Sequence, residues 1–136
     1  MTYSVLVFAY RKPGTTPEQF KAHYEGSHVP LLRELAGPHF PLSHTRRYIH
    51  RSGGQGEGTK RNATTPASVL IGSQEDFDYD AFAELNFEDA TAFQTFFGVM
   101  QQPDIAAKVA ADEEHFLDRS RMPVVVLGET NVTTKE

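Results

Sequence analysis

Residues 3–10 read Tyr-Ser-Val-Leu-Val-Phe-Ala-Tyr, a β-rich stretch that is apolar at both odd and even positions. Side chains on successive residues of a strand point to opposite faces. The odd positions from Val5 to Ala9 would therefore line one face, and the even positions from Leu6 to Tyr10 the other. A strand of this kind is covered on both faces.

The pattern that follows predicts the order strand, helix, strand, strand, helix, strand. The predicted helices cover residues 16–35, 89–100 and 104–117, and the remaining predicted strands cover 42–50, 79–87 and 124–127. This order is the ferredoxin-like βαββαβ plan of the α+β class, with helices on one face of an antiparallel sheet. Because the other face would expose the apolar side chains of the first strand, the sequence predicts a homodimer that pairs two sheets.

Length and composition set further limits. The chain has 136 residues, which fit one domain; we expect that domain over 1–129, with a flexible Gly-rich loop at 52–66 and a polar tail at 130–136. Eighteen acidic against 13 basic residues give a net charge of -5, the wrong sign for binding nucleic acid. No apolar run approaches the roughly 20 residues of a membrane span, and neither a secretory signal nor a cysteine is present, so we expect a cytoplasmic protein.

Motifs for common cofactors and metals are missing from the sequence. It has no P-loop, no dinucleotide-binding glycine pattern, no Gly-x-Ser-x-Gly and no cysteine to ligate zinc. His23 and His28 are five residues apart, which on an α-helix separates them by about 140° and keeps them from sharing one metal. We therefore expect neither a metal nor an organic cofactor.

The first helix turns two polar side chains toward the sheet. At about 100° per residue, Phe20, Tyr24, His28 and Leu31 share one stripe. Tyr24 and His28 are candidate catalytic residues, because buried polar groups need partners and often mark a pocket. The alternative is a satisfied core histidine beside the helix break that Pro30 predicts.

The third helix carries an acid in an apolar stripe. Asp112 shares that stripe with Ile105, Val109 and Phe116, and His115 lies about 60° around the axis. Asp112 and His115 are therefore candidates to flank the same cavity. The alternative places both at a solvated acidic edge of the helix.

Two neighbouring arginines on the second strand point to opposite faces. One of Arg46 and Arg47 must face the helices or the dimer interface, where a guanidinium suits a carboxylate or phenolate ligand. The alternative is surface charge on an edge strand. The sequence does not distinguish which arginine faces inward.

Several of these residues also carry a family resemblance. With Phe20, the pair 23–24, the run 28–31 and the run 112–118, the chain resembles the EthD-domain family of dimeric α/β-barrel proteins over residues 3–129. The segments 8–14, 41–48 and 77–81 resemble small fungal members encoded with aromatic polyketide synthases, in particular decarboxylases of atrochrysone carboxylic acid or related anthrone acids.

The resemblance implies a pocket between helices and sheet, a homodimer, no metal or cofactor, and an aromatic polyketide acid as substrate. We expect His28 to donate or relay a proton, Tyr24 to bind substrate oxygens, and Asp112 with His115 to set the imidazole tautomer or bind a phenol. The expected substrate-binding residues are Tyr10, Phe20, Arg46, Arg47, Tyr48 and Phe93. Alternatives on the same scaffold are a polyketide cyclase or dehydratase, a cofactor-free oxygenase, and a non-catalytic dimer that binds an aromatic ligand.

Overall fold

The computed structural model describes residues 2–52 and 65–136. Its strands are β1 (Tyr3–Ala9), β2 (Ser43–Tyr48), β3 (Ala81–Phe87) and β4 (Val124–Val126). Its α-helices are α1 (Pro17–His23), α2 (Val29–Ala36), α3 (Ala90–Met100) and α4 (Pro103–Glu113). The π-helical turn η1 (Tyr24–His28) joins α1 to α2, and the short 3₁₀ turns are η2 (Gly37–His39) and η3 (Gln74–Phe77). The loop expected at 52–66 lies almost wholly outside the described residues.

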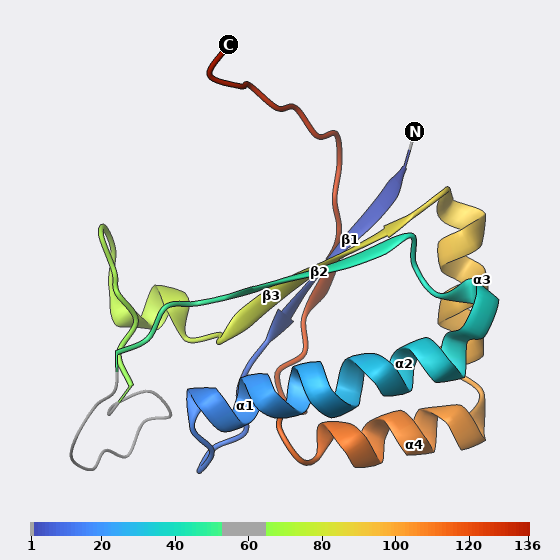
Figure 1. Ribbon diagram of the computed structural model, residues 1–136, viewed down its shortest axis with the longest axis horizontal. Helices are drawn as coiled ribbons and strands as arrows, with labels where there is room; N and C mark the ends of the chain where they lie inside the picture. The colour runs from blue at the N-terminus through green and yellow to red at the C-terminus, as the bar shows by residue number, and fades with distance from the viewer. Residues whose placement is uncertain (1, 53–64) are drawn as a thin grey trace.

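The four strands form one antiparallel sheet in the order β2-β3-β1-β4. Val5 pairs with Leu85, which pairs in turn with His44, so these three side chains share a face. Figure 1 shows the helices gathered on that side of the sheet, while the residues after β4 extend away from it. This arrangement confirms the prediction of a ferredoxin-like α+β fold.

The core fills the space between the helices and the sheet in two clusters. The first is built from aromatic side chains of α1, η1 and the segment after α4, namely Phe20, Tyr24 and Phe116. The second joins the opposite end of the sheet to α2 and α3 through Val5, Ala36, Phe87 and Phe96. The side chains between these clusters line the cavity described below.

The predicted break in the first helix takes the form of a π-helical turn. The amide of Val29 donates to the carbonyl of Tyr24, the spacing of a π-helix. Pro30 then falls in the first turn of α2, directly after the wider turn, so the irregular hydrogen bonding lies where the missing N–H of proline interrupts the helix. The wider turn changes which residues share a face: His23 and His28 lie on the same side, although α-helical geometry predicts a separation of about 140°.

Helix α4 ends at Glu113, before the predicted residue 117. In the turn that follows, the amide of His115 donates to the carbonyl of Asp112 at 3.1 Å, and Leu117 forms a bridge with Arg11. His115 therefore lies in the turn after α4, and the helix predicted to residue 117 ends four residues earlier.

Apolar side chains remain on the sheet face that carries no helix. Leu6 and Phe8 alternate with the buried Val5 along β1, and their partners Val125 and Phe82 share their face. Val125 is 50% exposed. The sheet face without helices, called the unhelical face below, is thus partly apolar, as the pattern of the first strand predicts.

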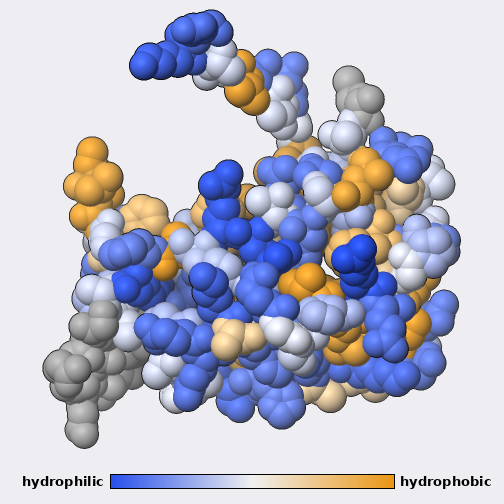
Figure 2. Space-filling model, in the orientation of Figure 1, coloured by the Kyte–Doolittle hydropathy of each residue, from blue (hydrophilic) through white to orange (hydrophobic). Residues whose placement is uncertain are grey.

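The rest of the surface is mixed. In the view of Figure 2 most of it is hydrophilic, with apolar side chains in separate small areas. Leu70 and Ile71 are almost fully exposed. Across residues 2–52 and 65–136, no helix has both the length and the apolar character needed to cross a membrane.

Candidate active site

A cavity of about 500 Å³ lies between the sheet and helices α2, α3 and α4. Most of its wall is apolar, with side chains such as Val7, Leu85 and Phe93. Six of its lining residues are polar or charged groups able to act on a ligand: Tyr24, His28, His44, Gln101, Glu113 and Arg119. A mostly apolar space with a few polar groups is typical of a small-molecule site.

His28 is the buried imidazole of this cavity. Its Nδ1 lies 2.8 Å from Oδ2 of Asp112 and donates to that carboxylate. The ring is held between Tyr24 and Phe116, with ring centroids 5.6 Å and 4.9 Å away. No residue of the described chain bonds Nε2, so this nitrogen is the atom that a ligand can reach.

Asp112 is anchored by three donors. Its Oδ1 accepts from Ser27 Oγ at 2.8 Å and from His23 Nε2 at 2.9 Å, while Oδ2 takes the bond from His28. Burial raises the pKa of Asp112, but the hydrogen bonds from Ser27, His28 and His23 outweigh it and hold that pKa below its usual value. Asp112 is therefore a carboxylate that fixes the His28 ring with Nδ1 protonated.

Both cavity histidines are held neutral near neutral pH. Burial lowers the pKa of His28, and the hydrogen bond to Asp112 only partly opposes this. Burial, with Arg46 and His28 adding to it, lowers the pKa of His44 to about 4. Nδ1 of His44 is buried without a hydrogen-bond partner in the described residues.

Tyr24 supplies a hydroxyl that stays protonated. Burial raises its pKa well above the ordinary value for tyrosine. Its ring contacts both imidazoles, with centroids 5.6 Å from His28 and 6.1 Å from His44. Tyr24, His28 and His44 thus form one polar end of the cavity, with a hydroxyl donor, a basic nitrogen and a second neutral imidazole.

Neither arginine of β2 is placed to orient a ligand in this cavity. Arg46 points to the helix side, where Glu25 binds it through Nε at 2.6 Å and Nη2 at 2.8 Å. The hydroxyl of Tyr48 also donates to Glu25. Arg47 is exposed and pairs in register with Phe82, on the face without helices. The inward arginine is therefore Arg46, and an internal carboxylate already occupies it.

His115 does not meet Asp112. It is exposed and stacks on His23 at a centroid distance of 5.3 Å. The residues that Asp112 does bind, His23 and Ser27 besides His28, come from the first helical segment. Asp112 therefore pairs with residues of the first helical segment, and the expected pairing with His115 is wrong.

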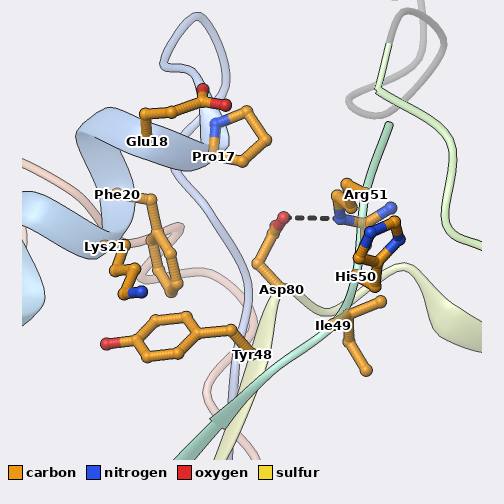
Figure 3. A pocket seen from close by; sticks show the side chains of 9 residues that line it. All are labelled: Pro17, Glu18, Phe20, Lys21, Tyr48, Ile49, His50, Arg51 and Asp80. Atoms are coloured by element: carbon orange, nitrogen blue, oxygen red, sulfur yellow. Dashed lines mark hydrogen bonds and ion pairs between the residues drawn. The ribbon is translucent and has the colours of Figure 1, made fainter. Parts of the chain in front are cut away.

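The aromatic residues expected to bind substrate are divided among three places. Phe93 lines the main cavity. Phe20 and Tyr48 line a second cavity of about 310 Å³ beside the buried Arg51 and Asp80 ion pair (Figure 3). Phe20 also packs on Tyr24, so it belongs to the wall behind the polar end.

Tyr10 lies outside both cavities. The guanidinium of Arg121 sits 3.9 Å from the centre of the Tyr10 ring, and Tyr79 packs against its edge. Its expected role in binding substrate has no support from this position.

The residues that the sequence did not single out are His44, Glu113 and Arg119. All three line the cavity. Alternation along β2 puts His44 on the face of Arg46 and Tyr48, which was the one available signal. In the part of the chain that the structure describes, no group of three or more His, Asp or Glu side chains could hold a metal ion.

Comparison with known proteins adds the family. A family model described as the EthD domain matches residues 12–120. An ethyl tert-butyl ether D family protein of Bacillus halodurans is 17% identical, with 96% of this chain and 100% of that chain covered and a TM-score of 0.52. An EthD-like protein of Ralstonia eutropha is 17% identical, with coverage of 98% and 96% and a TM-score of 0.53. A dimeric ferredoxin-like protein of unknown function from Thermobifida fusca is 13% identical, with coverage of 95% and 92% and a TM-score of 0.50. No curated protein sequence matches.

Proposed function

Because this chain belongs to the EthD domain family, we propose that it is a metal- and cofactor-independent decarboxylase of an aromatic polyketide carboxylic acid. The substrate class is that of atrochrysone or anthrone carboxylic acids, as the resemblance of segments 8–14, 41–48 and 77–81 implies. The observation that carries the proposal is the neutral imidazole of His28, backed by Asp112 and open at Nε2 to a mostly apolar cavity.

In the proposed reaction, His28 relays a proton from water to carbon. The substrate is a carboxylate near neutral pH, so Nε2 takes its proton from water, and the charge of Asp112 stabilises the imidazolium that results. Carbon dioxide then leaves, and the electrons of the broken C–C bond pass into the neighbouring carbonyl to give an enolate. The imidazolium transfers its proton to the carbon that lost carbon dioxide. General acid-base help of this kind is typically worth about 10²–10⁴ in rate.

The other polar groups of the cavity suit the enolate. The protonated hydroxyl of Tyr24 can donate to the oxygen on which negative charge develops. The His44 ring offers a second polar contact at the same end. The rest of the wall is apolar and excludes water. Loss of carbon dioxide is favoured there, because the charge of the carboxylate spreads over the enolate as the C–C bond breaks.

Dehydration or ring closure of the same polyketide is the second candidate. The observation that favours it is again the lowered pKa of His28, because a neutral imidazole can remove a proton next to a carbonyl. The two reactions differ in which substrate atom lies at Nε2.

The test is to incubate the purified protein with an anthrone carboxylic acid, without added metal or cofactor, and to follow product mass. Loss of the mass of carbon dioxide supports decarboxylation, and loss of the mass of water supports dehydration. His28→Asn should lower the rate by about 10²–10⁴, while the exposed His39→Asn serves as the matched control and should leave it unchanged. An unchanged substrate contradicts both reactions and favours a binding protein; a fully active His28→Asn variant contradicts the role of His28.

The proposal includes a homodimer in the cytoplasm. Leu6, Phe8 and Val125 give the unhelical face an apolar surface that a second sheet could cover. The Thermobifida fusca protein, described as dimeric, supports the same assembly by analogy of fold.

A further inference from the structure

Building on the proposed function, we infer that Arg119 is the residue that recognises the carboxylate of the ligand. Arg119 is the single cationic side chain among the described residues that line the main cavity. A carboxylic acid that enters this cavity therefore meets one guanidinium. Arginine suits this task because its planar fork can bind both carboxylate oxygens at once.

The guanidinium of Arg119 is only loosely held by the protein. Its Nε lies 3.3 Å from Glu113, and its Nη1 lies 3.4 Å from Glu114. Well-formed charge-assisted bonds are about 2.7–2.9 Å long. The side chain is 43% exposed, and Nη2 has no bond to any described residue. The Nη1 and Nη2 edge of the fork is thus available to a ligand.

The two glutamates act differently on Arg119. The Glu113 side chain is 12% exposed and lines the cavity, so its bond to Nε positions the guanidinium there. Glu114 is 67% exposed, and its long contact with Nη1 resembles a surface ion pair of little energetic value. A bound carboxylate can replace Glu114 while Glu113 keeps hold of Nε.

Two buried or half-buried arginines of the helix side, Arg46 and Arg51, are already occupied. Arg46 is bound twice by Glu25, and Arg51 forms a buried ion pair with Asp80. Arg119 is therefore a positioning and specificity residue, which holds the same carboxylate whose neighbouring carbon His28 protonates.

The experiment measures binding, which does not depend on turnover. Anthraquinone-2-carboxylate and its neutral primary amide are titrated by calorimetry into wild-type protein, Arg119→Gln, Arg119→Lys and Arg33→Gln. Arg33 is exposed on α2 and does not line the cavity, so Arg33→Gln is the matched control for the change in charge. The wild type should bind the carboxylate about ten-fold tighter than the amide, and Arg33→Gln should do the same.

Arg119→Gln should lose that preference and bind the amide as the wild type does, with Arg119→Lys between the two. The inference is overturned if Arg119→Gln keeps the preference, if it weakens both ligands equally, or if the wild type shows no preference. If Arg119→Gln loses the preference but the wild type releases no carbon dioxide from an anthrone carboxylic acid, carboxylate recognition is supported and the decarboxylase is rejected. Failure of the wild type to bind either compound overturns the carboxylate recognition by Arg119, whereas the mass assay on an anthrone carboxylic acid decides the decarboxylase.

Discussion

The carboxylate of Asp112 receives hydrogen bonds from His23, Ser27 and His28, three residues of one helical segment. This arrangement fixes one tautomer of His28, because Nδ1 must keep its proton to donate. The acceptor of the site is then Nε2, on the cavity side of the ring. The chemistry available to His28 is therefore set by a residue that does not itself line the cavity.

Asp112→Asn should reverse this tautomer. An amide nitrogen at this position can donate to Nδ1, which leaves Nε2 protonated and unable to accept a proton. We expect a loss of roughly 10²–10⁴ in turnover, and a ¹⁵N spectrum in which the His28 proton moves from Nδ1 to Nε2. Asp104→Asn, at the exposed start of α4, is the control. An unmoved tautomer in Asp112→Asn contradicts this account.

The depressed pKa of His44 predicts how stability depends on pH. The folded value is about 4 and the ordinary value is 6.5, so between them the unfolded chain binds more protons. Stability is therefore complete above the ordinary value and falls as pH drops toward the folded one, by roughly 2–3 kcal/mol of unfolding free energy. His28, whose pKa is also lowered, acts in the same direction, and Glu25 and Asp112 add to it from their ordinary values of 4.5 and 3.8 downward. The raised pKa of Glu113 opposes this slope above 4.5.

Urea denaturation at several pH values between about 7 and about 4.5 measures this slope. His44→Gln should flatten it, and His39→Gln, at an exposed position, should not. Equal slopes in wild type and His44→Gln would show that another group controls the pH dependence.

At the level of single residues, helical spacing was enough to point Tyr24 and His28 inward. It did not by itself place Asp112 beside His28, because the two lie 84 positions apart in the sequence. The expectation that Asp112 sets the imidazole tautomer came with the family resemblance. Alternation along the second strand left open whether Arg46 or Arg47 faces inward, and the bond of Arg46 to Glu25 depends on how η1 and β2 pack together. Pairings across elements cannot be read from the periodicity of either element alone.

At the level of elements, the π-helical turn η1 shapes the site. It lets His23 and His28, five residues apart, reach the same carboxylate. Pro30 marks the position of the irregularity in the sequence. Its π-helical form could not be predicted, because an α-helical kink satisfies the same local pattern equally well.

Replacing Gly26, inside η1, and Gly37, at the end of α2, by alanine should change the free energy of unfolding in opposite directions. A Cβ at Gly26 would meet no atom within 4 Å, so Gly26→Ala should raise the free energy of unfolding by about 0.5–1 kcal/mol. Gly37 ends α2 with φ at +55°, so Gly37→Ala should lower it by about 1–2 kcal/mol. Urea denaturation of both variants checks the pair. A gain in stability from Gly37→Ala would contradict the strain argument.

At the level of the whole molecule, the order of elements followed from hydrophobic periods and turn residues. Those signals are local, and the sheet order β2-β3-β1-β4 follows from them once helices cover a single face. The volume of the cavity did not follow, since it depends on how α2, α3 and α4 lean on the sheet.

The proposed dimer is tested on the unhelical face. Val125 is 50% exposed in the protomer, so Val125→Asp should leave the protomer folded and place a charge in the sheet-to-sheet contact. Sedimentation velocity should show a dimer for the wild type and a monomer for Val125→Asp. Ala107→Asp, on the exposed side of α4, adds the same charge elsewhere and should remain dimeric. A monomeric wild type contradicts the proposed assembly.

The sheet is one layer thick between the cavity and the face without helices. Along β1, Val5 and Val7 border the cavity, while Leu6 between them points the other way. The ligand cavity and the proposed dimer contact would then lie on opposite faces of the same sheet, and neighbouring residues of β1 would contact one or the other. Coupling between the two faces must be reciprocal. If dimerisation raises the affinity for a ligand, the ligand raises the dimerisation constant by the same factor.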